Sequence, residues 1–267
     1  MRRRSLLIHK AWWKPLLYIG ALLGLIWWGC TNPTKPVTEE PVGRSDGMDP
    51  TDALSIDAAR LALRWVYATG SGDTNQVDIP GEYRWQFAFG LYAITADTLF
   101  PASDSVSTLY QIHTFPEPNL FDITVQVDST AHWVRNWNKG CRLTGNPTVD
   151  SLMDWYALFV TNIHSSTKHW IVYLKSGRPV NTHALAQQFA EIPAVQWAEP
   201  GMAEGDGNDI QAWKVQDSLF YDYILKWGDC PAGCTERYTW HFKVILSGTG
   251  RVTYLGSDEH LPDGQTL

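Results

Sequence analysis

The sequence predicts a mixed α+β protein, with helices in its first part, a four-stranded antiparallel sheet in the middle and further strands at the end. Three observations support this. Residues 158–174 alternate apolar and polar side chains on both sides of a polar turn, which is typical of a β-hairpin. Leu185, Phe189 and Ile192 then recur at helical spacing. Residues 239–246 alternate again, as expected of a half-buried strand.

Residues 1–29 have the pattern of an export signal, because basic residues precede a short apolar run. That run, residues 15–28, is shorter than the ~20 residues that span a bilayer. It ends in Gly29-Cys30, which resembles the lipobox of bacterial lipoproteins. The resemblance implies that Cys30 is lipidated and anchors the exported protein to a bacterial membrane, inner or outer. An uncleaved membrane anchor is the alternative.

Residues 30–52 predict a disordered tether, because they combine prolines with Thr, Glu and Gly and carry few apolar side chains. A helical N-terminal region, residues 53–118, is expected to follow. Its first helix, residues 52–67, begins at Asp52, and a second covers residues 81–94 in spite of Gly90. Residues 105–113 favour a short strand.

The middle region, residues 119–205, begins with a clear strand over residues 120–128. A short helix over residues 131–137 and a second helix capped by Asn146 come next. The hairpin, a helix capped by Asn181 and a last strand with Val195 and Trp197 complete the region. The order strand, helix, strand, strand, helix, strand predicts a split βαβ, or ferredoxin-like, sheet.

Residues 189–201, FAEIPAVQWAEPG, are similar to the end of the propeptide/inhibitor domain of subtilisin-type serine proteases. In that family the sheet packs on the protease and the tail after the last strand lies in its cleft. The resemblance therefore implies a docking surface on the sheet face formed by residues 159–165 and 170–174, away from the helices. The protein-binding tail that it implies comprises Glu199, Pro200, Gly201, Met202, Ala203 and Glu204.

The last region, residues 206–267, is expected to be rich in strands, with a hairpin turn at residues 247–250. Cys230 and Cys234 bracket Pro-Ala-Gly, which resembles a cysteine-bracketed turn of uncharacterised exported bacterial proteins. Because export leads to an oxidising compartment, we expect a disulfide between them. A metal site with His241 is the alternative. Cys141 is expected to be a buried free thiol.

Charge and motifs narrow the function classes. The net charge is −7 and no basic stripe follows the signal, so nucleic acid is excluded as a partner. Residues 204–209 contain Asp206, Asn208 and Asp209, which are weak candidates for calcium, but their spacing is not that of an EF-hand. We therefore expect a solvated loop and no metal. No catalytic residue and no cofactor are predicted.

The sequence thus predicts a non-catalytic protein of the cell envelope that is held by a lipid and binds a protease or another envelope protein. A glycan- or ligand-binding protein is the first alternative, because the chain holds 14 tryptophans. An envelope hydrolase is the second.

Overall fold

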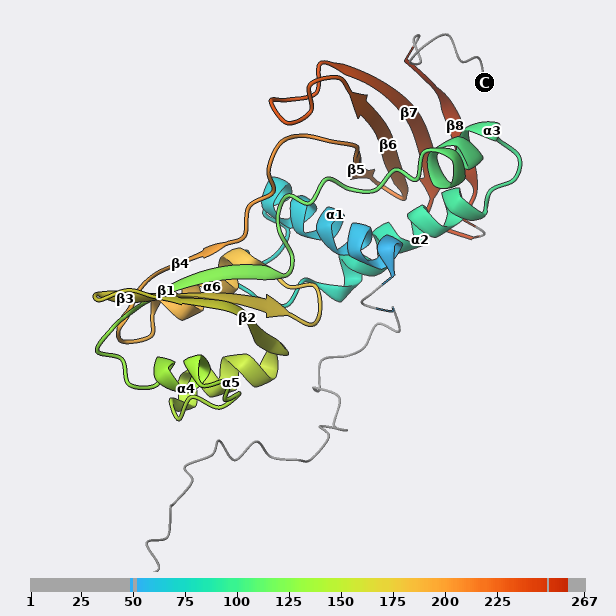
Figure 1. Cartoon of the computed structure of the whole chain (residues 1–267). Coiled ribbons are helices and arrows are strands. Elements are labelled where there is room, and N and C mark those ends of the chain that lie inside the picture. The colour runs from blue at the N-terminus through green and yellow to red at the C-terminus, as the bar shows by residue number, and fades with distance from the viewer. Residues whose placement is uncertain (1–48, 50–51, 249, 259–267) are drawn as a thin grey trace, which may run out of the picture.

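The computed structural model describes residues 49, 52–248 and 250–258. Within these residues the chain is an α+β protein whose strands form two four-stranded antiparallel sheets (Figure 1). Sheet A has the order β2-β3-β1-β4 and sheet B the order β5-β6-β7-β8. The strands are β1 (Asp122–Asp128), β2 (Leu158–Ser165), β3 (His169–Ser176), β4 (Val195–Pro200), β5 (Asp209–Val215), β6 (Ser218–Trp227), β7 (Glu236–Ile245) and β8 (Val252–Ser257). The helices are α1 (Ala53–Thr69), α2 (Gly81–Ala96), α3 (Pro101–Asp104), the π-helical turn η1 (Ser105–Leu109), α4 (Val134–Asn138), α5 (Pro147–Trp155) and α6 (Thr182–Ala190).

Helices α4, α5 and α6 pack on one face of sheet A. Ile123, Val125 and Val127 of β1 point into this core, because alternate residues of a strand face opposite sides. There they share a core with Leu152 of α5 and Phe189 of α6. The element order and the strand order are both consistent with the split βαβ arrangement expected from the sequence.

Three helices begin at the cap residues that the sequence indicates: α1 at Asp52, α5 at Asn146 and α6 at Asn181. The side chain of Asp52 accepts a hydrogen bond of 3.0 Å from the backbone N–H of Ser55 at the start of α1. The side chain of Asn146 caps α5, with Pro147 at the first helical position. Such side-chain acceptors satisfy N–H groups that have no partner within the helix.

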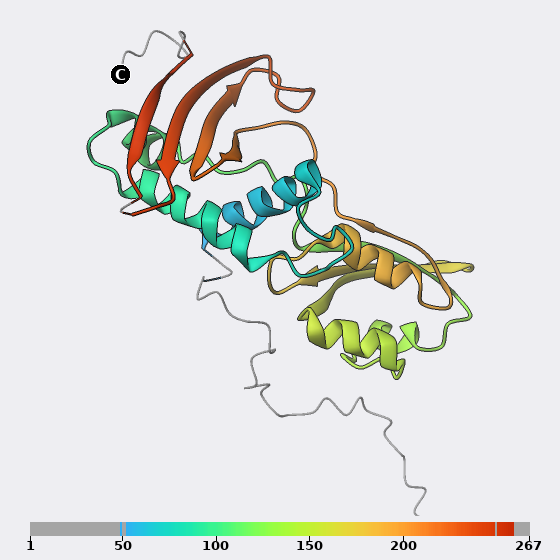
Figure 2. The same ribbon diagram turned by 180° about the vertical axis from the view of Figure 1, so that it is seen from behind.

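Sheet B shares its core with the two N-terminal helices (Figure 2). Trp240 and Phe242 of β7 are buried against apolar side chains of α1 and α2. Tyr221 of β6 donates a hydrogen bond of 2.9 Å to the carbonyl oxygen of Phe87 in α2. A Cβ atom added at Gly90 would lie 2.1 Å from the Tyr221 hydroxyl. The glycine in the middle of α2 is therefore required by close packing.

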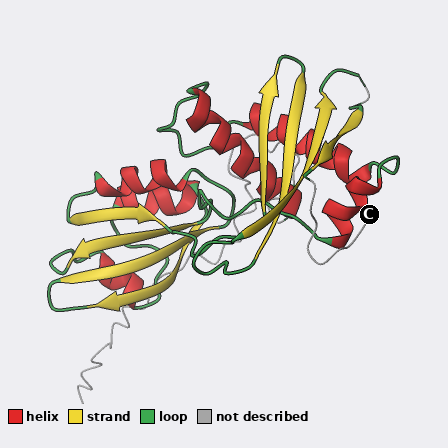
Figure 3. Cartoon of the chain, turned by 90° about the horizontal axis from the view of Figure 1, so that it is seen from above, coloured by secondary structure: helices red, strands yellow, loops and turns green. Residues whose placement is uncertain are grey.

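The two sheets present their uncovered faces on the same side of the molecule. Helices α1 and α2 lie below sheet B in Figure 1, and α4 and α5 lie below sheet A. The view from above shows the strands of both sheets, with helices beside them and partly behind them (Figure 3). A ligand that approaches from this side meets both sheets.

Charged side chains of α1 hold the connector that leads from the N-terminal helices to β1. Arg60 donates to the hydroxyl of Thr114 at 2.5 Å, and burial lowers the pKa of its guanidinium to about 10. Arg64 donates to the carbonyl oxygen of Glu117 at 2.6 Å and to the Oδ1 atom of Asp209 at 2.9 Å. The connector and the start of β5 are thereby fixed to the same helix.

Two sequence predictions are wrong. Residues 105–113 form no strand, because Ser105–Leu109 continues α3 as a π-helical turn. The hydroxyls of Ser105 and Ser107 donate hydrogen bonds to the carbonyl oxygens four residues earlier in the chain, which stabilises this turn. Cys141 is not a free thiol: no cysteine among the described residues is free. Its burial agrees with the prediction.

The predicted signal, the lipid attachment at Cys30 and almost all of the tether lie outside the described residues. Among the described residues, no helix is both long enough and apolar enough to span a membrane.

Candidate functional site

The face of sheet A opposite the helices carries a group of apolar side chains, which we call the open face: Phe159, Ile171, Tyr173 and Trp197. Phe159 is 49% exposed and Tyr173 is 38% exposed. Ile171 lies opposite Gln126, which lies opposite Trp197 on β4. No helix crosses these strands in the view from above (Figure 3). The open face is therefore an aromatic and aliphatic surface that belongs to neither core.

Polar side chains surround the open face. The imidazole of His164 meets the Tyr173 ring edge-on, with 5.8 Å between ring centroids. Lys175 lies opposite Phe159 and holds its ammonium group 6.0 Å from the centre of the Phe121 ring. An apolar centre with a polar rim is the usual anatomy of a protein-binding surface.

A bulge in β2 decides which residues of the predicted docking strand reach this face. The pairing of β2 with β3 shifts between Val160 and Asn162, and the hydroxyl of Thr161 donates to the Tyr173 carbonyl oxygen at 3.1 Å. Beyond the shift, Ile163 faces the helices while Asn162 points to the open side. Strict alternation along β2 is therefore interrupted, as bulges require.

The predicted protein-binding tail begins in the last two residues of β4, and the segment after the strand is held at Gly201 and at Asp206. Gly201 donates to the carbonyl oxygen of Asp122 at 2.7 Å, and Asp206 donates to that of Cys230 at 2.9 Å. Between these two points Met202 is 84% exposed and Glu204 is also exposed. Glu199 and Pro200 are the last residues of β4 itself. The tail is thus a short projecting loop that continues directly into sheet B.

The three weak calcium candidates are bound to different protein groups. Asp206 pairs with the ammonium group of Lys226 at 2.6 Å, which holds the pKa of its carboxyl below the usual value. Asn208 accepts from the backbone N–H of Lys226, and Asp209 pairs with Arg64. Among the described residues, no group of three or more His, Cys, Asp or Glu is arranged to hold a metal ion.

Cys230 and Cys234 are joined by a disulfide, as the sequence predicts. His241 is engaged elsewhere, since its Nδ1 atom lies 2.6 Å from the Oδ1 atom of Asp222. The turn closed by the disulfide supports the projecting loop, because the carbonyl oxygen of Cys230 accepts the Asp206 bond.

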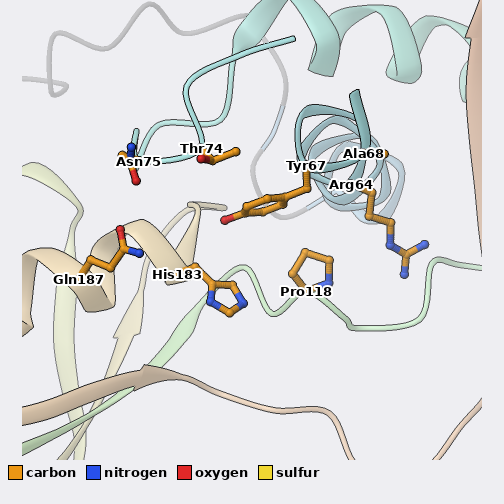
Figure 4. A pocket seen from close by; sticks show the side chains of 8 residues that line it. All are labelled: Arg64, Tyr67, Ala68, Thr74, Asn75, Pro118, His183 and Gln187. Carbon is orange, nitrogen blue, oxygen red and sulfur yellow. The ribbon is translucent and has the colours of Figure 1, made fainter. Parts of the chain in front are cut away.

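A cavity of about 570 Å³ lies where the two halves of the molecule meet. Figure 4 shows the Tyr67 ring in the middle of the lining, with His183 and Pro118 below it and Asn75 and Gln187 to its left. The guanidinium of Arg64 points away from this ring and is already bonded to backbone oxygens. The cavity marks the junction between α1, the loop that follows it and α6.

Asn181 closes this junction and is 1% exposed. Its Nδ2 group donates to the carbonyl oxygens of Thr74 and Gln76, at 2.9 and 3.0 Å. Its Oδ1 atom accepts from the Tyr67 hydroxyl at 2.9 Å and from the backbone N–H of Ala184 at 3.3 Å. The sequence identifies Asn181 only as a helix cap. The other three partners are distant in sequence, and no local signal reveals them.

Comparison with protein-family models, with curated proteins and with solved structures finds no match.

Proposed function

We propose that this chain is a non-catalytic protein of the bacterial cell envelope that is held to the membrane by a lipid on Cys30, a thioether that requires the sulfur of this cysteine to be unpaired in the exported protein. We further propose that it binds another protein, in the manner of a protease propeptide or inhibitor. The observation that carries the binding proposal is the open face of sheet A, where Phe159 and Tyr173 stand exposed.

Burial of apolar area drives most protein association, and aromatic side chains are enriched in binding surfaces. Phe159 and Tyr173 are large enough to serve as anchors, and Ile171 and Trp197 extend the apolar area between them and β4. Lys175 and His164 supply a polar rim that can select a partner.

The loop after β4 supports the comparison with a protease inhibitor. Met202 projects into solvent while the backbone is held at Gly201 and Asp206. A segment held in this way loses little conformational freedom when it enters a cleft, which favours tight binding. An extended segment can also pair its backbone with a strand of the partner.

Inhibition of purified subtilisin-like proteases tests the binding proposal. We expect the chain without its signal to slow at least one protease of a panel. The double variant Phe159→Ser/Tyr173→Ser should lose this effect. Trp155→Ser is the matched control, because Trp155 is 62% exposed but lies on α5, away from the open face. If no protease is slowed and Met202 is simply cleaved, the likeness to protease inhibitors is one of fold alone.

Metabolic labelling with a fatty-acid analogue tests the anchor separately. The wild-type protein should be labelled and the variant Cys30→Ala should not, since the lipid is attached to this cysteine. Equal labelling of the two proteins would refute the lipoprotein proposal and leave the binding proposal intact.

A further inference from the structure

The cavity at the junction between α1 and α6 has the size and position of a small-ligand site. Its volume of about 570 Å³ lies within the range of ~300–1,000 Å³ that such sites have, and they form preferentially where two parts of a molecule meet. One wall is α1 with the loop after it, which contribute Tyr67, Thr74 and Asn75. The other wall is α6, which contributes His183 and Gln187 (Figure 4). A ligand held here would contact both halves at once.

The Tyr67 side chain offers this cavity a flat ring in a fixed position. Its hydroxyl donates to the Oδ1 atom of Asn181 at 2.9 Å, and burial raises the pKa of this hydroxyl, so it remains a neutral donor. Asn181 is itself 1% exposed and is bonded to the loop at Thr74 and Gln76. Tyr67 remains 42% exposed, and its one ring contact among the described residues is edge-on, with His183 at 6.2 Å and 76°. The ring can therefore receive a flat partner without a change in its own conformation.

Three polar side chains of the cavity have no partner in the described part of the chain. The amides of Asn75 and Gln187 and the imidazole of His183 make no hydrogen bond or ion pair with a described residue. Each amide presents a donor and an acceptor side by side in one plane, and a neutral imidazole presents one of each. Figure 4 places Asn75 and Gln187 on the same side of Tyr67, one above the other. The cavity thus combines a flat ring with two amide groups beside it.

The cavity offers no free counter-charge. Arg64 lines it, but its guanidinium is turned away from the Tyr67 ring and is bonded to the carbonyl oxygens of Phe115 and Glu117 and to the carboxylate of Asp209. No Asp, Glu or Lys is among the described residues of the lining. A charged ligand would exchange water for a site without an opposite charge, which costs free energy. The lining therefore favours an uncharged ligand.

We propose that this cavity is a binding site for an uncharged nucleoside that carries an adenine ring. Planar bases stack on tyrosine rings, and this contact is available at Tyr67. The amides of Asn and Gln are the side chains that pair with the donor and acceptor at the N6/N7 edge of adenine. With the base on Tyr67, this edge would point towards Asn75 and Gln187, which leaves His183 to bond to a hydroxyl of the ribose.

Related ligands fit the cavity less well. A nucleotide or a nucleic acid adds phosphates that would meet no free cation in the lining, in a chain whose net charge is −7. A peptide group presents the same donor and acceptor as a base edge, but it is not a ring that can cover the face of Tyr67. A saccharide has hydroxyls for the amides but no π system to stack. A flat ring with such an edge and without charge is the chemistry of a nucleobase.

Calorimetric titration of the chain without its signal tests the proposal, with adenosine as the probe. Gln187→Leu removes the amide, keeps most of the bulk and should weaken the binding about tenfold or more, because an amide paired with a base edge contributes at least this factor. Gln188→Leu is the matched control, since Gln188 is the next residue of α6 and does not line the cavity. AMP should bind more weakly than adenosine because of its phosphate. N-acetylphenylalaninamide, which carries peptide groups, should also bind more weakly.

Circular dichroism of each variant separates lost binding from lost folding. Binding that is retained in Gln188→Leu and weakened in a folded Gln187→Leu variant would support the site. Asn75→Ala repeats the test on the opposite wall, so that a folding defect of one variant does not decide the result. The proposal is overturned if adenosine does not bind at millimolar concentration or if the folded Gln187 and Asn75 variants bind it as tightly as the control. It is also overturned if AMP or N-acetylphenylalaninamide binds as tightly as adenosine. Because the cavity lies away from the open face, the protease test does not bear on this result.

Discussion

Replacing Asn181 by Ala should destabilise the protein by about 3 kcal/mol. Loss of the helix cap at the backbone N–H of Ala184 costs about 1 kcal/mol. The carbonyl oxygens of Thr74 and Gln76 lose their donor in a partly buried setting, at about 1 kcal/mol each. The Tyr67 hydroxyl adds little, since this residue is 42% exposed and can bond to water instead.

Urea unfolding followed by circular dichroism measures this loss as a difference in the free energy of unfolding. Asn146→Ala is the matched control, because Asn146 caps α5 through Thr148 and Val149, and its side chain should cost only about 1 kcal/mol. Asn181→Asp keeps the cap acceptor but not the two donors and should fall between the two. If Asn181→Ala costs no more than Asn146→Ala, the bonds to the loop do not stabilise the junction and the reasoning fails.

Three further predictions concern other parts of the fold. Gly90→Ala should destabilise the protein by about 1–3 kcal/mol, because the added Cβ would overlap the Tyr221 hydroxyl; a thermal midpoint at or above that of the wild type would contradict this packing. The hydrogen bond to the buried Asp57 raises the pKa of His113, so the bond stabilises the fold fully below the usual pKa of 6.5 and this contribution is lost as the pH rises through the raised pKa. The urea midpoint of the wild type should therefore fall as the pH rises from 5 to 8, and that of His113→Gln should fall less. An equal dependence of the two midpoints on pH would disprove this contribution of His113. The Cys230–Cys234 disulfide should contribute about 1–2 kcal/mol, because it closes a short loop; peptide mapping without reductant should recover the linked pair, and comparing the unfolding of the wild type with that of Cys230→Ser/Cys234→Ser gives the contribution.

Periodicity and caps were sufficient to predict most of the elements. Asp52, Asn146 and Asn181 each mark a helix start that the structure contains. Alternation along residues 158–174 predicted the hairpin of sheet A. Residues 105–113 were assigned wrongly because the periodicity of so short a stretch does not distinguish a strand from a helical turn.

The surfaces were harder to predict, because they depend on how strands pair. For sheet A the sequence predicts a docking surface on residues 159–165 and 170–174. The bulge after Val160 selects which side chains of β2 reach this surface, and it has no signal in the sequence. On sheet B, Trp213 and Phe220 meet across the turn at Gln216-Asp217. A two-residue turn between alternating segments was the available signal for that pair. The contact between Asp222 and His241 beside this pair needs the register of β7 as well, which only the fold supplies.

The shared core of α1, α2 and sheet B has a consequence for the order of folding. These helices come from the start of the described chain, but the strands that cover them come from its end. Until β5–β8 are available, α1 and α2 can pack only on each other, and the apolar side chains that sheet B covers face water. The segment that forms sheet A is continuous and, apart from Val77, closes its core from its own nearby residues, so its contacts cost less chain entropy. A chain truncated after β4 should therefore retain sheet A while α1 and α2 aggregate or are degraded by proteases.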